Sequence, residues 1–188
     1  MDSRDVTTAI RELVRPALRE VGFSRFAGRN AWRIGQTKID VVNFQSFGNW
    51  LADRLGCTTF SFGVNVGCYF PNVPPSPLFP RTNANQLPKE YECHFRGELH
   101  RKLEQPEWDR RDIWYVDPDG IYLEPALRDA IRALLTEGMA WFARLDDRAE
   151  VLRILREGPM TKDLQGYGNP GSQVRRHLLH SFDDDATA

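Results

Sequence analysis

His94, Arg96 and Glu98 are the residues of this chain whose types and spacing could do chemistry together. Every second side chain of a β-strand faces the same side of the sheet, so the three would form one row. A histidine, a cation and a carboxylate within reach of one another could serve a hydrolase or a nucleic-acid-processing enzyme. The same pattern is typical of a solvated edge strand, where charges discourage unwanted pairing, and we favour that second interpretation.

Other residues suit binding rather than catalysis. Trp50 and Trp108 lie in polar, loop-like stretches, and exposed tryptophans are enriched at protein interfaces. Asn65 lies on the polar side of a predicted strand, where it could neighbour Arg96 across the sheet. We therefore take Asn65, Trp50, Trp108 and Arg96 as the candidate contacts for a ligand or partner.

The motifs for cofactors and metals are incomplete. Gly166–Gly171 matches G-x-G-x-x-G, but no predicted strand precedes it and too little chain follows for a nucleotide-binding unit. The adjacent Cys93 and His94 would point to opposite faces of a strand, and His177 with His180 lacks a third ligand. We predict no metal and no cofactor, and we expect each histidine to lie at the surface.

The composition is that of a globular intracellular domain, with 41% hydrophobic and 27% charged residues. The 25 basic and 26 acidic side chains nearly cancel, so general attraction to nucleic acid or to an anionic membrane is not expected. Three cysteines without a C-x-x-C pair are a poor disulfide framework and fit a reducing compartment. With no signal peptide and no membrane-spanning apolar run, we predict a cytoplasmic protein.

The elements that would position these residues follow an α+β order. An amphipathic helix opens the chain and ends at Gly22, with a kink or break near Val14 because Pro16 lacks an amide donor. Strands are predicted over 31–34, 38–47, about 58–70, 93–99 and 113–116, followed by a long helix over 123–145 and a second helix capped by Asp146. We predict an N-terminal helix, an antiparallel sheet of about four or five strands, and two C-terminal helices packing on one sheet face.

One domain is expected over residues 1–157. A proline-rich surface loop at 71–91 contains half of the twelve prolines, a density that excludes a helix interior or a central strand. Residues 158–188 are predicted to form a flexible C-terminal tail with a short helix from Ser172 to His180.

Four short segments resemble a bacterial family, domain of unknown function 4304. They are Gly22-Phe23 after the first helix, Gln45-Ser46 after a strand, the strand Phe62–Gly67, and the helical run Trp141–Asp146. The resemblance covers most of the chain to about Leu155. It implies a small bacterial cytosolic protein of α+β type, and it implies no activity and no site residues.

The leading hypothesis is a non-enzymatic protein-binding module, with toxin neutralisation or a defence role as one concrete form. It depends on the missing catalytic motifs, the proline-rich loop and the tryptophans. Two alternatives stay open. The first is a hydrolase or nucleic-acid-processing enzyme that uses the row of His94, Arg96 and Glu98. The second is a small-ligand sensor whose pocket floor would be the small-residue face of the strand around Asn65.

Overall fold

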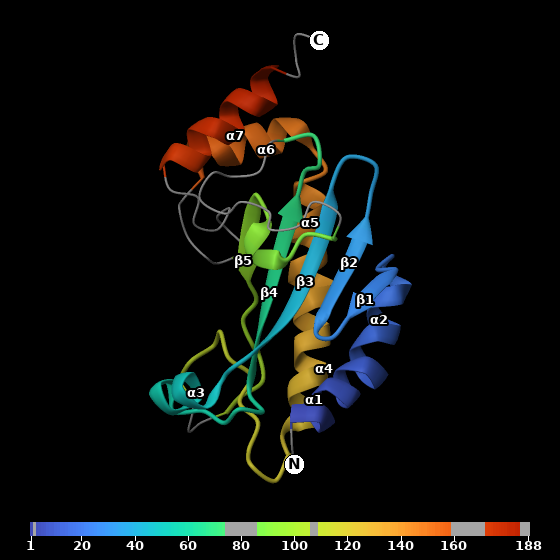
Figure 1. The fold of residues 1–188 in the computed structure, drawn as a ribbon, viewed down its shortest axis with the longest axis vertical. Coiled ribbons are helices and arrows are strands. Elements are labelled where there is room, and N and C mark those ends of the chain that lie inside the picture. The colour runs from blue at the N-terminus through green and yellow to red at the C-terminus, as the bar shows by residue number, and fades with distance from the viewer. Residues whose placement is uncertain (2, 74–85, 106–108, 159–171, 185–188) are drawn as a thin grey trace.

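A computed structural model describes residues 1, 3–73, 86–105, 109–158 and 172–184 (Figure 1). Its centre is a five-stranded antiparallel sheet in which the strands follow one another in chain order. The strands are β1 (Arg25–Ala27), β2 (Asn30–Ile34), β3 (Ile39–Ser46), β4 (Phe62–Tyr69) and β5 (Phe95–Glu98). The predicted α+β class and antiparallel sheet are confirmed.

Helices lie before, within and after the sheet. The opening helix consists of α1 (Ser3–Ala9), the π-helical turn η1 (Ile10–Val14) and α2 (Arg15–Glu20), and α3 (Asn49–Leu55) joins β3 to β4. The short 3-10 helix η2 (Glu90–Glu92) precedes β5, and α4 (Leu123–Ala133), the π-helical turn η3 (Leu134–Gly138), α5 (Met139–Arg144), α6 (Arg148–Glu157) and α7 (Ser172–Asp184) follow it. No helix in the described ranges is long and apolar enough to span a membrane.

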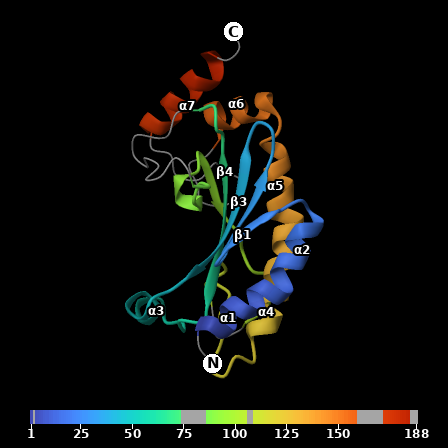
Figure 2. The same cartoon turned by 45° about the vertical axis from the view of Figure 1, so that its right-hand side comes forward.

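The main core lies between one face of the sheet and the two long helices. The helix from α1 to α2 and the helix from α4 to α5 run side by side across that face (Figures 1 and 2). The predicted alternation of β4 is confirmed, because Phe62, Val64, Val66 and Cys68 are all buried in this core. The opposite face of the sheet is therefore the one available for a site.

The opening helix accommodates Pro16 without breaking. Pro16 is the second residue of α2, and the turn before it widens into the π-helical turn η1. Since proline has no amide donor and its ring crowds the preceding turn, the wider turn supplies the adjustment that was expected as a kink or break near Val14.

Three local predictions were wrong. Residues 113–116 form no strand and contribute only an isolated bridge between Trp114 and Phe62. The polar stretch around Trp50 is not a loop, since α3 forms there and ends at Gly56, whose φ of 71° favours glycine. The cap of α6 is Asp147, whose side chain accepts a hydrogen bond from the Ala149 amide at 2.9 Å.

The C-terminal helix α7 packs beside α6 (Figure 1). Its Phe182 ring meets Phe70 edge-on at 5.0 Å between centroids, and its Leu178 is fully buried. The G-x-G-x-x-G motif and most of the proline-rich loop lie outside the described residues.

Candidate functional site

A row of polar side chains crosses four strands on the face of the sheet opposite the long helices. The strand register places Asn30 opposite Asn43, Asn43 opposite Asn65, and Asn65 opposite Glu98. All four are half-buried. Asparagine is depleted in strands, so three asparagines in one cross-strand row do not follow from folding preference alone.

The amides of this row hold one another. Asn43 Nδ2 donates to Asn30 Oδ1 at 2.8 Å, and Asn65 Nδ2 donates to Gln45 Oε1 at 2.8 Å. We call Asn30, Asn43, Gln45 and Asn65 the amide strip. Each of these bonds uses one end of each amide group, and an amide side chain has both donor and acceptor atoms. The strip therefore presents fixed hydrogen-bonding groups to solvent or to a partner.

The chain covers the sheet on both sides of the amide strip. At one end, Trp32 Nε1 donates to the Pro88 carbonyl at 2.6 Å, and Trp32, Val41, Tyr69 and Cys93 form a small buried cluster. At the other end, a side chain at Gly63 would lie 3.5 Å from the Asp112 carbonyl oxygen. Of the small-residue face expected to form a pocket floor, Gly63 and Gly67 are buried and Asn65 is half-buried.

Gly67 is needed for the close approach of the segment before β5. A β-carbon at Gly67 would lie 2.7 Å from Cys93 Sγ and 3.2 Å from the Glu90 carbonyl oxygen, whereas one at Gly63 would make only ordinary contacts. We therefore expect Gly67→Ala to destabilise the protein by about 1–3 kcal/mol through overpacking. Urea unfolding of Gly67→Ala and of the matched Gly63→Ala checks this. Equal effects of the two substitutions would contradict the explanation.

His94, Arg96 and Glu98 contact three different partners: His94 the backbone of Phe70, Arg96 the carboxylate of Glu90, and Glu98 the ring of His100. His94 is only 4% exposed, its Nδ1 accepts the Phe70 amide at 3.0 Å, and its ring stacks on Tyr69. The expectation of a surface histidine is wrong here, because the His94 ring packs against Tyr69 and Phe70 at the end of β4. Arg96 donates from Nε and Nη2 to the two oxygens of the Glu90 carboxylate, at 2.7 and 3.3 Å.

Glu98 belongs to a group of charges at the other end of β5. Its carboxylate lies 3.9 Å from His100 Nε2, while Arg110 pairs with Asp112 through bonds of 3.1 and 2.6 Å. Burial alone would raise the pKa of Asp112, but the hydrogen bonds and charge of Arg110 outweigh it and lower the pKa. At this end of the amide strip, the charge of Asp112 is thus neutralised by Arg110.

None of the cysteines has the properties of a nucleophile. Cys57, Cys68 and Cys93 form no disulfide bond, and burial raises the pKa of each thiol. In the described part of the chain, no three histidine, cysteine or acidic side chains gather as a metal site.

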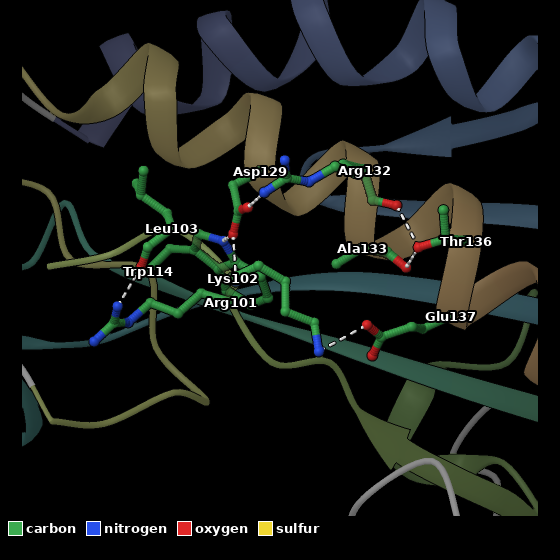
Figure 3. A network of polar contacts seen from close by, with 9 residues as sticks. All are labelled: Arg101, Lys102, Leu103, Trp114, Asp129, Arg132, Ala133, Thr136 and Glu137. Atoms are coloured by element: carbon green, nitrogen blue, oxygen red, sulfur yellow. Dashed lines mark hydrogen bonds and ion pairs between the residues drawn. The ribbon is translucent and has the colours of Figure 1, made fainter.

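Asp129 anchors the segment that carries His100. Its carboxylate accepts the Trp114 indole N–H and the Lys102 amide, each at 2.9 Å, and pairs with Arg132 (Figure 3). These bonds tie the chain after β5 to α4. The bonds of Asp129 therefore help to position Glu98 and His100, which lie next to the amide strip, although Asp129 itself is not part of the strip.

Trp50 lies on α3, on the opposite side of the sheet from the long helices (Figure 2). Its side chain is 70% exposed, as its polar sequence context predicted, and the Arg54 guanidinium lies 5.1 Å from its ring centre. The helix is held by its own small core, formed by Phe47, Ala52 and Ile113. Trp108, the other predicted contact, lies outside the described residues.

Sequence reasoning missed Asn30, Asn43 and Arg54. The available signal for the asparagines was their presence inside predicted strands, which disfavour this residue. Their alignment depends on strand register, and that information is not local. Arg54 was missed because α3 was taken as a loop.

The comparisons with known proteins give one match. A family model described as domain of unknown function (DUF4304) matches residues 14–145, which include the whole sheet, α3 and the amide strip. No curated protein and no solved structure matches the chain. Since the matched residues make up more than half of the chain, this protein belongs to the family of domain of unknown function 4304.

Proposed function

We propose that this protein is a protein-binding module and that α3 carries the central contact. The observation that supports this most is the exposure of Trp50, at 70% of its side chain, on a helix that its own hydrophobic cluster holds in place. Tryptophan and arginine are the residues most enriched in the energetic centres of protein interfaces. Trp50 and Arg54 present both types side by side, 5.1 Å apart.

The amide strip extends this surface. A β-carbon at Gly63 would lie 3.8 Å from the Phe47 ring, and Gly63 pairs with Gln45 of the strip. The cluster beneath α3 therefore borders the strip directly. An aromatic anchor next to fixed hydrogen-bonding groups is the usual composition of a protein interface.

Binding is better supported than catalysis. His94 Nδ1 already accepts a hydrogen bond from a backbone amide, and Arg96 donates to Glu90 from both Nε and Nη2. A general base needs an available lone pair within reach of the substrate proton. The unpaired thiols also support a reducing compartment, and we place the module in the cytoplasm.

Replacing Trp50 with alanine should abolish capture of the partner. Loss of a central tryptophan costs about 2–4 kcal/mol of binding energy, and a 70% exposed side chain contributes little to stability. The measurement is a quantitative pull-down from native lysate, with the thermal midpoint of each variant as a check on folding.

Tyr91→Ala is the matched control. Tyr91 is also an exposed aromatic, at 46%, with the Lys89 ammonium 5.8 Å from its ring centre, but it lies on η2. We expect this variant to keep the partner. If Trp50→Ala retained every protein that the wild type captures, α3 would not be the contact and the proposal would fail.

A further inference from the structure

A second surface carries a concentration of arginines whose charge the chain itself does not neutralise. Arg11, Arg15 and Arg19 recur at every fourth residue of the opening helix, and Arg25 lies on the neighbouring strand β1. Arg25 pairs with Trp32 and so points to the other face of the sheet, whereas Arg11, Arg15 and Arg19 share one side of the helix; we call these three helix residues the arginine edge. The α2–β1 side of the sheet lies away from α3 in both views, so this surface is separate from the one around Trp50 (Figures 1 and 2).

The geometry of the arginine edge is set by Phe26. The Arg15 and Arg19 guanidinium groups lie 5.5 and 5.2 Å from the centre of the Phe26 ring. Arg15 also donates to the Gly28 carbonyl oxygen at 3.0 Å. The ring and the carbonyl oxygen hold the two cations close together on one side of the helix, although like charges four residues apart destabilise a helix.

Several other surface arginines have carboxylate partners. Arg110 pairs with Asp112, Arg128 with Glu124 and Arg153 with Glu150, at 2.6 to 2.7 Å. Among the described residues, Arg15 and Arg19 make no ion pair, and Arg11 reaches only Glu12, at 3.7 Å between two exposed side chains. In the described part of the chain, exposed Arg54 and Arg111 also make no ion pair, but neither belongs to a row of arginines on one helix, and the net charge of the chain is −1.

We propose that the arginine edge binds an acidic segment of a partner protein. Guanidinium groups pair with carboxylates in a planar, two-bonded geometry, and exposed cations in a row suit an extended anionic chain. The arginine edge would be a second contact surface of the protein-binding module proposed above, and the partner segment that it binds would be negatively charged. This proposal does not depend on the role of Trp50.

The observations favour carboxylates over nucleic acid. Domains that bind nucleic acid are strongly basic as a whole, whereas this chain has an isoelectric point near 6.4. Bases also need an aromatic surface for stacking, and the Phe26 ring is already occupied by two guanidinium groups. Edge protection, in which a charge discourages pairing to β1, would account for Arg25 but not for the row on the helix.

The test compares two double variants that lose the same charge. Arg11→Gln with Arg19→Gln removes two exposed cations of the arginine edge and leaves the hydrogen bond of Arg15 in place. Arg128→Gln with Arg153→Gln removes two cations that have partners on α4 and α6. The probes are fluorescent decaglutamate and an oligothymidylate of equal charge, measured by anisotropy at low and at physiological salt.

We expect decaglutamate to bind the wild type, with an affinity that falls as the salt concentration rises. The arginine-edge variant should bind it about tenfold more weakly, and the control variant should bind it as the wild type does. The Trp50→Ala variant should also retain it, which separates this result from the test of α3. The proposal is overturned if decaglutamate does not bind, if both double variants weaken equally, or if the oligothymidylate binds more tightly and is lost from the arginine-edge variant.

Discussion

Replacing Asp129 with alanine should lower the free energy of unfolding by about 3 kcal/mol. The Asp129 side chain is 3% exposed and accepts hydrogen bonds from the Trp114 indole N–H and the Lys102 amide (Figure 3). Removal of the carboxylate leaves these donors buried without an acceptor, which costs far more than the net value of a hydrogen bond. Urea unfolding of the purified variant measures the effect.

Glu124→Ala is the control for this substitution. Glu124 lies on the same helix and pairs with Arg128, but both side chains are more than half exposed, at 61% and 66%. An exposed pair four residues apart contributes only about 0.3–0.5 kcal/mol. A similar loss for both variants would show that Asp129 acts through the helix and not through the bonds to Trp114 and Lys102.

The contribution of Asp129 should also depend on pH. Burial alone would raise the pKa of Asp129, but hydrogen bonds from the Leu103 and Lys102 amides, from Trp114 and from Arg132 outweigh it and lower the pKa. A carboxyl group with a lowered pKa in the folded state adds stability above its unfolded pKa, near 3.9, and this stability is lost as the pH falls through the folded value. The difference in the free energy of unfolding between the wild type and Asp129→Asn should therefore become smaller below about pH 4.

Lys38→Ala should destabilise the protein by about 3–4 kcal/mol. Lys38 is a charged side chain with only 4% exposure. Its Nζ lies 3.0 Å from Asp146 and 3.2 Å from Asp40, and it donates to the Phe142 carbonyl in the last turn of α5. Without it, the buried Asp40 keeps only Arg33 as a cation partner, and breaking a buried pair leaves an uncompensated charge.

A double-mutant cycle separates the charge from the packing of this side chain. Asp40 Oδ1 lies within ion-pair distance of Lys38 but accepts no hydrogen bond with good geometry, and burial raises the pKa of the Asp40 carboxyl. Lys38→Met combined with Asp40→Asn should therefore cost less than the sum of the two single variants. Strict additivity, measured by urea unfolding, would mean that Lys38 acts mainly through its hydrogen bond to the Phe142 carbonyl oxygen of α5.

The sequence by itself determined the class of the fold and the family. Alternation along residues 62–68 indicated which side of β4 meets the core, and the helical spacing from Leu123 to Leu145 indicated the long second helix. These are local properties, because side-chain direction follows from strand or helix geometry within a few residues. The exposure of Trp50 could be predicted in the same way, from its polar neighbours.

The tertiary structure decided which residues meet. Alternation places Asn43 and Asn65 on the polar side of their strands, but only the register of β3 on β4 puts them opposite each other. The alternating pattern that suggested a row of His94, Arg96 and Glu98 is equally local, and contacts with Phe70, 24 residues away, and with Glu90, in the turn before β5, directed two of these side chains elsewhere. The spacing of the arginine edge is local to its helix, but Arg15 and Arg19 are held together only because β1 brings Phe26 against α2. Strand pairing and helix packing join residues far apart in the chain, so their outcome is not contained in any short segment.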